Sequence, residues 1–208
     1  MFDDEKDESV EYWSQQFELL KVDPRVWAAD SDSLMRSFNI LAEQHTRDLG
    51  DNIRRAVKSA GAPVPRIPEI GANAMMLGAL ATEVLFKGIA LSRKEVQESL
   101  ESEDKAIAKR LWSHRLSDIA VLAGVELTGD EATLCEQLEI FATWAGRYST
   151  PKLVKDMMPL RRSPWTGQAM LPNTYSNVDF MRIRNLNARY RSRLPEMPEV
   201  QLGLASGR

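Results

Sequence analysis

Apolar residues recur along this chain at intervals of three and four positions, the spacing that gathers side chains on one face of an α-helix. The first run consists of Val10, Trp13, Phe17 and Leu20. Asp23 and Pro24 follow as a cap and a first-turn proline for a short second segment. Ser33 is predicted to cap a long third helix that ends at Gly61.

The most hydrophobic segment lies at residues 70–92, where apolar or small residues occupy almost every side of the predicted helix. Such a helix is typical of the buried centre of a bundle. Residues 93–110 carry many charges of both signs and are predicted to form either a solvated helix or a mobile connection. A short amphipathic helix over residues 111–123 is predicted to end at Gly124.

Two more helices are predicted in the C-terminal third. Residues 128–130 supply a turn and a cap for a helix that ends near Gly146. Residues 176–179 read as a capping box that opens a last helix, which extends to about Leu194.

The connection over residues 151–175 contains four prolines and is unusually long for a compact domain. Trp165 and Tyr175 indicate that part of it docks, either onto its own bundle or onto a protein partner. An alternating strand pattern is absent from the sequence, so the predicted fold class is all-α.

Length and composition favour one soluble domain. The 208 residues are 43% hydrophobic and 27% charged, which is enough apolar material for a core. We expect an acidic flexible terminus at residues 1–8, a helical domain at residues 9–194 and a flexible tail at residues 195–208.

The net charge of −3 hides an asymmetry along the chain. Residues 152–208 carry ten basic residues (Lys and Arg) and four acidic residues (Asp and Glu), whereas the first 151 residues carry seventeen basic and twenty-six acidic residues. The acidic start lacks the basic and then apolar pattern of a secretory signal. The longest charge-free apolar run, at residues 70–82, is too short to span a bilayer, so the chain is predicted to be cytoplasmic, without membrane association.

Few kinds of catalytic chemistry are compatible with this composition. Cys135 is the single cysteine, which excludes a disulfide framework and a four-cysteine zinc site, and we expect it to be a partly buried structural thiol. His45 and His114 are the only histidines, and neither stands in a metal-binding motif. Glycine-rich phosphate loops are also absent, so neither a metal nor a cofactor is predicted.

His114 allows two interpretations. Arg110 precedes it by four residues, so the two side chains would share a face if the segment were helical. Such a pair could cleave RNA, with the imidazole taking a proton and the guanidinium stabilising phosphorane charge. The simpler interpretation is a partly buried histidine packed beside Trp112.

The last helix combines an apolar arc with flanking arginines. One flank carries Arg182, Arg189 and Arg193, and the other carries Arg184 and Arg191. These side chains could bind phosphates of RNA or a nucleotide. They could equally pair with the acidic body of the protein or be solvated.

Three segments together resemble the HEPN superfamily of small helical proteins, over roughly residues 70–194. Residues 81–87 are similar to the family's Glu and Lys separated by three positions, here Glu83 and Lys87. Residues 113–119 resemble its His-Asp-Leu opening, with Arg115 in place of Asp. Residues 144–151 resemble a Gly-Arg-Tyr-Pro helix ending.

The resemblance implies an up-and-down bundle of four or five helices, commonly a homodimer. Catalytic members are metal-independent endoribonucleases in which an Arg, usually followed by a polar residue, precedes a His by four to six intervening positions. Arg184 and Asn185 match the opening of that motif, but Arg189 stands where the His is needed. Arginine stays protonated and cannot act as a general base. Bacterial defence and toxin–antitoxin systems are the setting that the family implies.

Four polar residues are assigned structural roles. Glu83 and Lys87 are one turn apart in the most apolar helix and must be paired if they are buried. Arg147 and Tyr148, at a helix end, are expected to satisfy terminal carbonyls and to pack against the C-terminal loop.

Three functions therefore stay open. The first is a binding or regulatory module that engages RNA, a nucleotide or a protein through the basic last helix. The second is a divergent endoribonuclease that uses His114 with Arg110 or with the helix of Arg184. The third is an interaction protein whose loop at residues 151–175 wraps a partner subunit.

Overall fold

The structure of this chain, a computed structural model, describes residues 4–147, 153–154, 161–162, 169–170 and 173–196. Its helices are α1 (Asp4–Val22), α2 (Pro24–Lys58), α3 (Gly71–Leu91), α4 (Lys94–Glu101), α5 (Lys105–Leu111), α6 (Leu116–Leu122), α7 (Gly129–Ile140) and α8 (Asn177–Arg191). The predicted all-α fold class is confirmed. The single addition in the described part is a pair of two-residue antiparallel strands, β1 (Arg161–Arg162) and β2 (Ala169–Met170).

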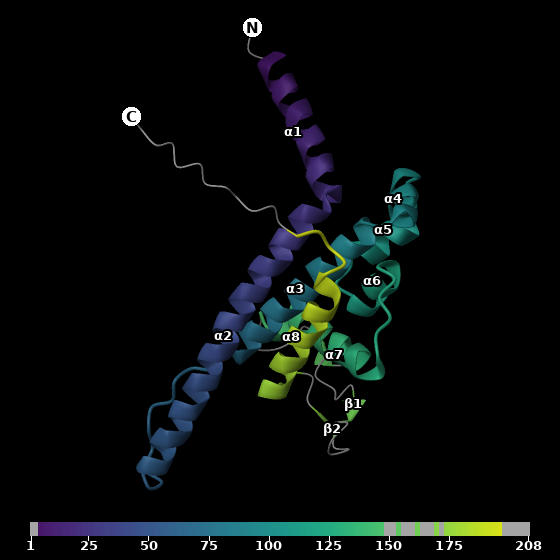
Figure 1. Cartoon of the computed structure of the whole chain (residues 1–208). Helices are drawn as coiled ribbons and strands as arrows, with labels where there is room; N and C mark the ends of the chain where they lie inside the picture. The colour runs from purple at the N-terminus through teal and green to yellow at the C-terminus, as the bar shows by residue number, and fades with distance from the viewer. Residues whose placement is uncertain (1–3, 148–152, 155–160, 163–168, 171–172, 197–208) are drawn as a thin grey trace, which may run out of the picture.

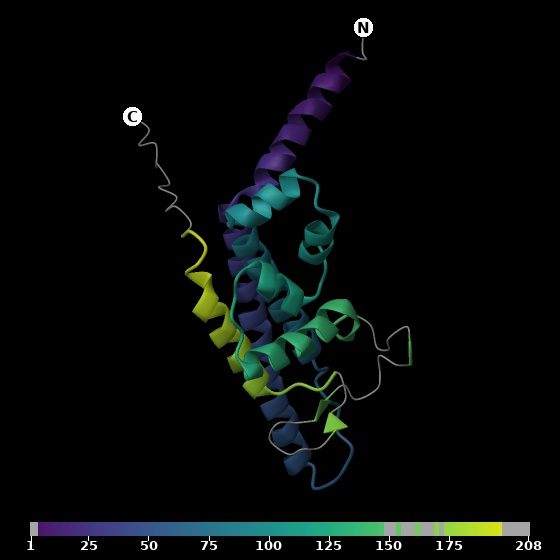
Figure 2. The same ribbon diagram turned by 90° about the vertical axis from the view of Figure 1, so that its right-hand side faces the viewer.

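Helix α3 is the centre of the bundle. Helices α2 and α8 and the α6–α7 region surround it (Figures 1 and 2), and fifteen of its residues are buried. Its small residues allow close approach, because a Cβ added at Gly78 would lie 3.0–3.1 Å from Ile183 of α8 and Phe38 of α2. Helix α3 is long and apolar enough to cross a membrane, but 78% of that stretch is buried inside the protein, as in the core helix of a soluble protein.

Helix α2 is one continuous helix of 35 residues, so the prediction of a separate helix starting at Ser33 was wrong. The start is set by Asp23, whose carboxylate accepts a hydrogen bond from the backbone N–H of Arg25 at 2.9 Å, and by Pro24 in the first turn. Nothing interrupts the backbone before Ser33. Helix α1 begins at Asp4, so the predicted domain boundary at residue 8 falls inside a helix.

The charged region after α3 forms two short helices, α4 and α5, rather than one helix or an unstructured connection. The predicted helix at residues 111–123 begins only at Leu116, because the chain bends between Trp112 and Arg115. Gly124 ends α6 as predicted, with a left-handed φ of 60° that favours glycine.

The predicted cap at the start of α7 and the predicted capping box at the start of α8 are confirmed, and the cap of α7 is a complete capping box. Thr128 and Glu131 exchange side-chain and backbone hydrogen bonds at the start of α7, and Ser176 and Asp179 do so at the start of α8. Helix α7 continues into a π-helical turn, Phe141–Ala145, instead of remaining α-helical to residue 146.

The predicted loop at residues 151–175 lies largely outside the described residues, as does Trp165. Its last residue, Tyr175, packs onto the protein's own bundle. The Tyr175 ring lies 5.8 Å from that of Phe141 and 6.0 Å from that of Phe180. This end of the loop therefore docks internally, while an intermolecular role for the rest stays a prediction.

Candidate functional site

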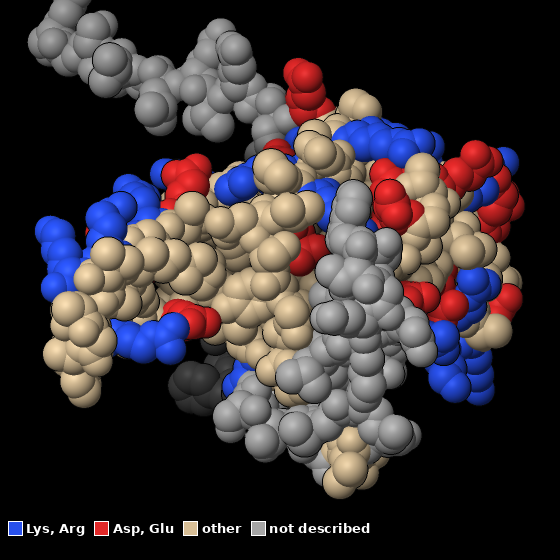
Figure 3. All heavy atoms as spheres, turned by 90° about the horizontal axis from the view of Figure 1, so that it is seen from below, with Lys and Arg blue, Asp and Glu red and all other residues tan. Residues whose placement is uncertain are grey.

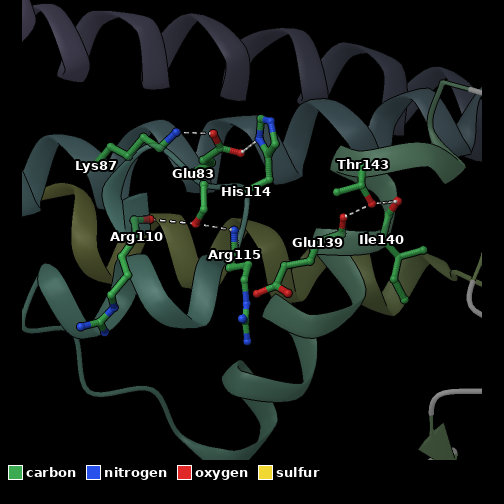
Figure 4. A network of polar contacts seen from close by, with 9 residues as sticks. Glu83, Lys87, Arg110, His114, Arg115, Glu139, Ile140 and Thr143 are labelled. Carbon is green, nitrogen blue, oxygen red and sulfur yellow. Dashed lines mark hydrogen bonds and ion pairs between the residues drawn. The ribbon is translucent and has the colours of Figure 1, made fainter. Parts of the chain in front are cut away.

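A buried carboxylate links two segments that are thirty-one residues apart in sequence (Figure 4). Glu83 of α3 accepts a hydrogen bond from Lys87 Nζ at 2.6 Å through one oxygen. Its other oxygen lies 2.9 Å from His114 Nδ1. The side chains of Glu83 and Lys87 are only 6% and 9% exposed, whereas that of His114 is 54% exposed. The cluster is therefore a buried ion pair with an imidazole between it and solvent.

The bend between α5 and α6 presents His114 to this pair. Ser113 Oγ donates to the carbonyl of Arg110 at 2.7 Å and accepts from the backbone N–H of Arg115 at 3.1 Å. These bonds replace the helical bonds that the bend interrupts. Because Nδ1 faces Glu83, the second ring nitrogen, Nε2, lies on the far side of the imidazole. A histidine oriented by a carboxylate in this way can exchange a proton or a hydrogen bond through Nε2.

Aromatic and cationic groups surround the same position. Lys87 Nζ lies 5.8 Å from the centre of the Trp112 ring, and Lys21 Nζ of α1 lies 6.0 Å from it. The centre of the Trp27 ring of α2 is 6.1 Å from the centre of the Trp112 ring. Trp112 is itself 41% exposed, so the cluster has an accessible aromatic surface next to His114.

Arg110 and His114 are not brought together. Helix α5 ends at Leu111, so the four-residue spacing no longer places the two side chains on one face. The Arg110 guanidinium extends away from the imidazole (Figure 4) and its Nη2 donates to the carbonyl of Asp118 at 3.5 Å. The structural partner of His114 is Glu83, a pairing that the sequence analysis missed.

The two arginines on one flank of α8 hold that helix against α2. Arg191 binds the carboxylate of Asp32 through two bonds of 2.7 and 2.8 Å, and Arg184 Nε donates to Asn39 Oδ1 at 2.7 Å. The Asp32 hydrogen bonds raise the pKa of Arg191. From Arg184 to Arg191 the chain advances seven residues along α8, and their partners move back seven residues along α2, from Asn39 to Asp32. The two helices therefore run antiparallel.

The three arginines on the other flank bind the start of α7 and the loop before it. Arg182 donates to Asp179 and to the carbonyl of Asp130, Arg189 to Glu131 at 2.9 Å, and Arg193 to the carbonyl of Gly124 at 2.8 Å. All five arginines thus have partners within the chain, while Asn185 is exposed. On the face seen from below, basic and acidic side chains are interspersed (Figure 3).

Two other residues that the sequence singled out, Arg147 and Cys135, do not belong to the cluster around His114. Arg147 is exposed at the end of the π-helical turn, and Tyr148 lies outside the described residues. Cys135 is fully rather than partly buried, and this burial raises the pKa of its thiol to about 12. Groups of three or more His, Cys, Asp or Glu side chains able to hold a metal are absent from the described part of the chain.

Comparison of the chain with models of protein families, with characterised proteins and with solved structures finds no match. The fold defines an all-α helical bundle, and the function rests on the geometry of the cluster.

The contact between Glu83 and His114 had one usable signal in the sequence. Both residues lie in segments that the sequence singled out, residues 81–87 and 113–119, and Gly146 of the third such segment, residues 144–151, packs on α3. A Cβ added at Gly146 would clash with the Cβ of Met76 on α3. The three segments therefore converge on one helix.

Proposed function

We propose that this chain is a HEPN-like helical protein that binds RNA or a nucleotide at the cluster of Glu83, Lys87, Trp112 and His114, and that it acts as a binding or regulatory module. The observation that carries the proposal is the 2.9 Å contact between Glu83 and His114, since it joins two of the resembling segments at an accessible polar position. Bacterial defence is the setting that fits such a module.

The cluster offers the two kinds of contact that single-stranded RNA uses. The exposed part of the Trp112 ring can stack on a base, and stacking of this kind contributes about 1–3 kcal/mol per base. His114 Nε2 can bond to a phosphate or ribose oxygen, while Glu83 holds the ring in place. Lys87 neutralises the buried carboxylate, so the site does not repel a phosphate.

The arginines of α8 have a second role in this proposal. Each guanidinium has five N–H donors, so an arginine bonded within the chain can still donate to a phosphate from its exposed side. Arg189 can do so, since its side chain is half-exposed at 52%. Its contribution would be general electrostatic attraction that weakens with salt.

The test is binding of a fluorescent single-stranded RNA, and of ATP, to the full chain and its variants. We expect Trp112→Ala and His114→Ala to weaken binding of the active probe at least tenfold, and Arg189→Ala to weaken it only a few-fold at low salt. Lys94→Ala, on the exposed face of α4, is the control and should bind normally. Equal affinity of the His114→Ala and Lys94→Ala variants would contradict the proposed site.

The Glu83–His114 geometry also supports the alternative of a metal-independent endoribonuclease. A carboxylate that orients an imidazole is the arrangement of a general base, and His114 Nε2 could take the proton of a ribose 2′-hydroxyl. RNA cleavage in EDTA by the wild-type chain, lost in both His114→Ala and Glu83→Gln, would favour this alternative. An absence of cleavage across varied RNAs would leave the binding module.

A further inference from the structure

Helix α1 exposes an apolar stripe that the rest of the described protein does not cover. Val10, Trp13, Phe17 and Leu20 are 64, 66, 63 and 52% exposed. The helix extends beyond the bundle in both views (Figures 1 and 2). Its last turn is anchored to α2, because Trp27 Nε1 donates to the carbonyl of Lys21 at 2.9 Å. Two large aromatic rings on a projecting helix are typical of an interaction surface.

The spacing of the stripe is that of a coiled coil. The four residues are separated by three, four and three positions, so they occupy alternating a and d positions of a heptad. The stripe is therefore narrow and runs along the helix axis. It fits a second helix that carries a similar narrow stripe, rather than a broad groove.

We propose that α1 pairs with α1 of a second copy of this chain in an antiparallel two-stranded coiled coil. In that arrangement a and d positions of the two helices meet. Val10 then packs against the partner's Leu20, and Trp13 against the partner's Phe17. All four apolar residues of each helix find an apolar partner, and the pairing closes by two-fold symmetry.

Charge selects the antiparallel direction. Residues 1–11 contain six acids and one lysine, so a parallel pair would place two acidic segments side by side. In the antiparallel pair, the e positions of the heptads meet. The register assigns Ser14 and Lys21 to e, so Ser14 meets the partner's Ser14, and the acidic residues 1–11 of each chain run alongside the partner's segment that carries Lys21.

The area is sufficient for a specific but weak dimer. Large aromatic side chains bury roughly 150–250 Å² each, so burying the exposed part of the stripe in two copies removes on the order of 1,000 Å² from water. This lies at the lower limit of specific interfaces. The pairing does not depend on the proposed function, since it uses none of the four residues of the proposed binding site.

The decisive experiment is sedimentation of the full chain over a range of concentrations. We expect a monomer–dimer equilibrium in which Trp13→Glu raises the dimer Kd by about a hundredfold or more, as for the central aromatic residue of an interface. Tyr12→Glu is the matched control, because Tyr12 is also exposed on α1 but lies off the stripe, and its Kd should stay within about threefold. Far-ultraviolet circular dichroism checks that both variants keep their helices.

The direction is measured separately with spin labels on cysteines introduced at Ser14 or Ser9, since the native Cys135 is buried. From the helical rise of 1.5 Å per residue, the two Ser14 positions lie almost level along the axis and the two Ser9 positions about 18 Å apart. A monomer at every concentration, a dimer insensitive to Trp13→Glu, or equally short distances at both positions would each overturn the proposal.

Discussion

Replacing Lys87 by methionine tests whether the ion pair at the candidate site is desolvated. The change keeps a linear side chain but leaves the Glu83 carboxylate, 6% exposed, with His114 as its remaining side-chain partner. Breaking a buried ion pair from one side costs about 3–5 kcal/mol, because a buried charge loses its compensation. Since His114 still contacts the carboxylate, we expect the lower part of that range, about 3 kcal/mol.

The free energy of unfolding is measured by urea denaturation followed by circular dichroism. A loss of about 3 kcal/mol lowers the urea midpoint by about 1–2 M, given a typical dependence of 2–3 kcal/mol/M for a domain of this size. The same loss lowers Tm by about 6–12 °C. Either shift is large compared with a total stability of about 5–15 kcal/mol.

The matched control is Lys94→Met, which breaks a second Lys–Glu pair one helical turn apart. Lys94 lies 3.4 Å from Glu98, and both side chains are exposed, so this change should cost less than about 0.5 kcal/mol. The double variant Glu83→Leu/Lys87→Met should recover most of the lost stability, because it removes the buried charges together. If Lys87→Met cost no more than Lys94→Met, the argument from burial would be refuted.

Three further outcomes are expected. Gly88→Ala should destabilise the protein by about 1–3 kcal/mol in the same assay despite the better helix propensity of alanine, since the new Cβ would lie 2.7 Å from the Cβ of Trp27; a neutral result would contradict this close approach. Cys135 should resist thiol reagents at pH 8 until the protein is unfolded. Because burial raises the pKa of its thiol to about 12, the free energy of unfolding should fall as the pH rises from about 9, where the thiol of the unfolded chain ionises, toward 12. A double-mutant cycle on Arg191 and Asp32 should give a favourable coupling of at most about 1 kcal/mol, as expected for a partly exposed pair, and a coupling of zero would show that this contact does not hold α8 to α2.

The sequence by itself determined most of the helices and several of their ends. The 3.6-residue periodicity, the apolar character of residues 70–92 and the capping residues Thr128 and Ser176 are local properties. The helices, the buried position of α3 and the two caps that they predict are confirmed. The errors were also local in origin. Ser33 can cap a helix, but a cap residue acts only where the backbone leaves the helical conformation, and α2 continues through it.

The tertiary structure decided which side chains meet. Arg110 and His114 are close in sequence but separate in space, whereas Glu83 and His114 are distant in sequence and in contact at 2.9 Å. The arginines of α8 were expected to bind phosphate, pair with the body or face solvent, and their positions relative to α2 and α7 determine which partners they have. Periodicity identifies the face of a helix but not the helix that packs against it, because that choice depends on the packing of the whole core.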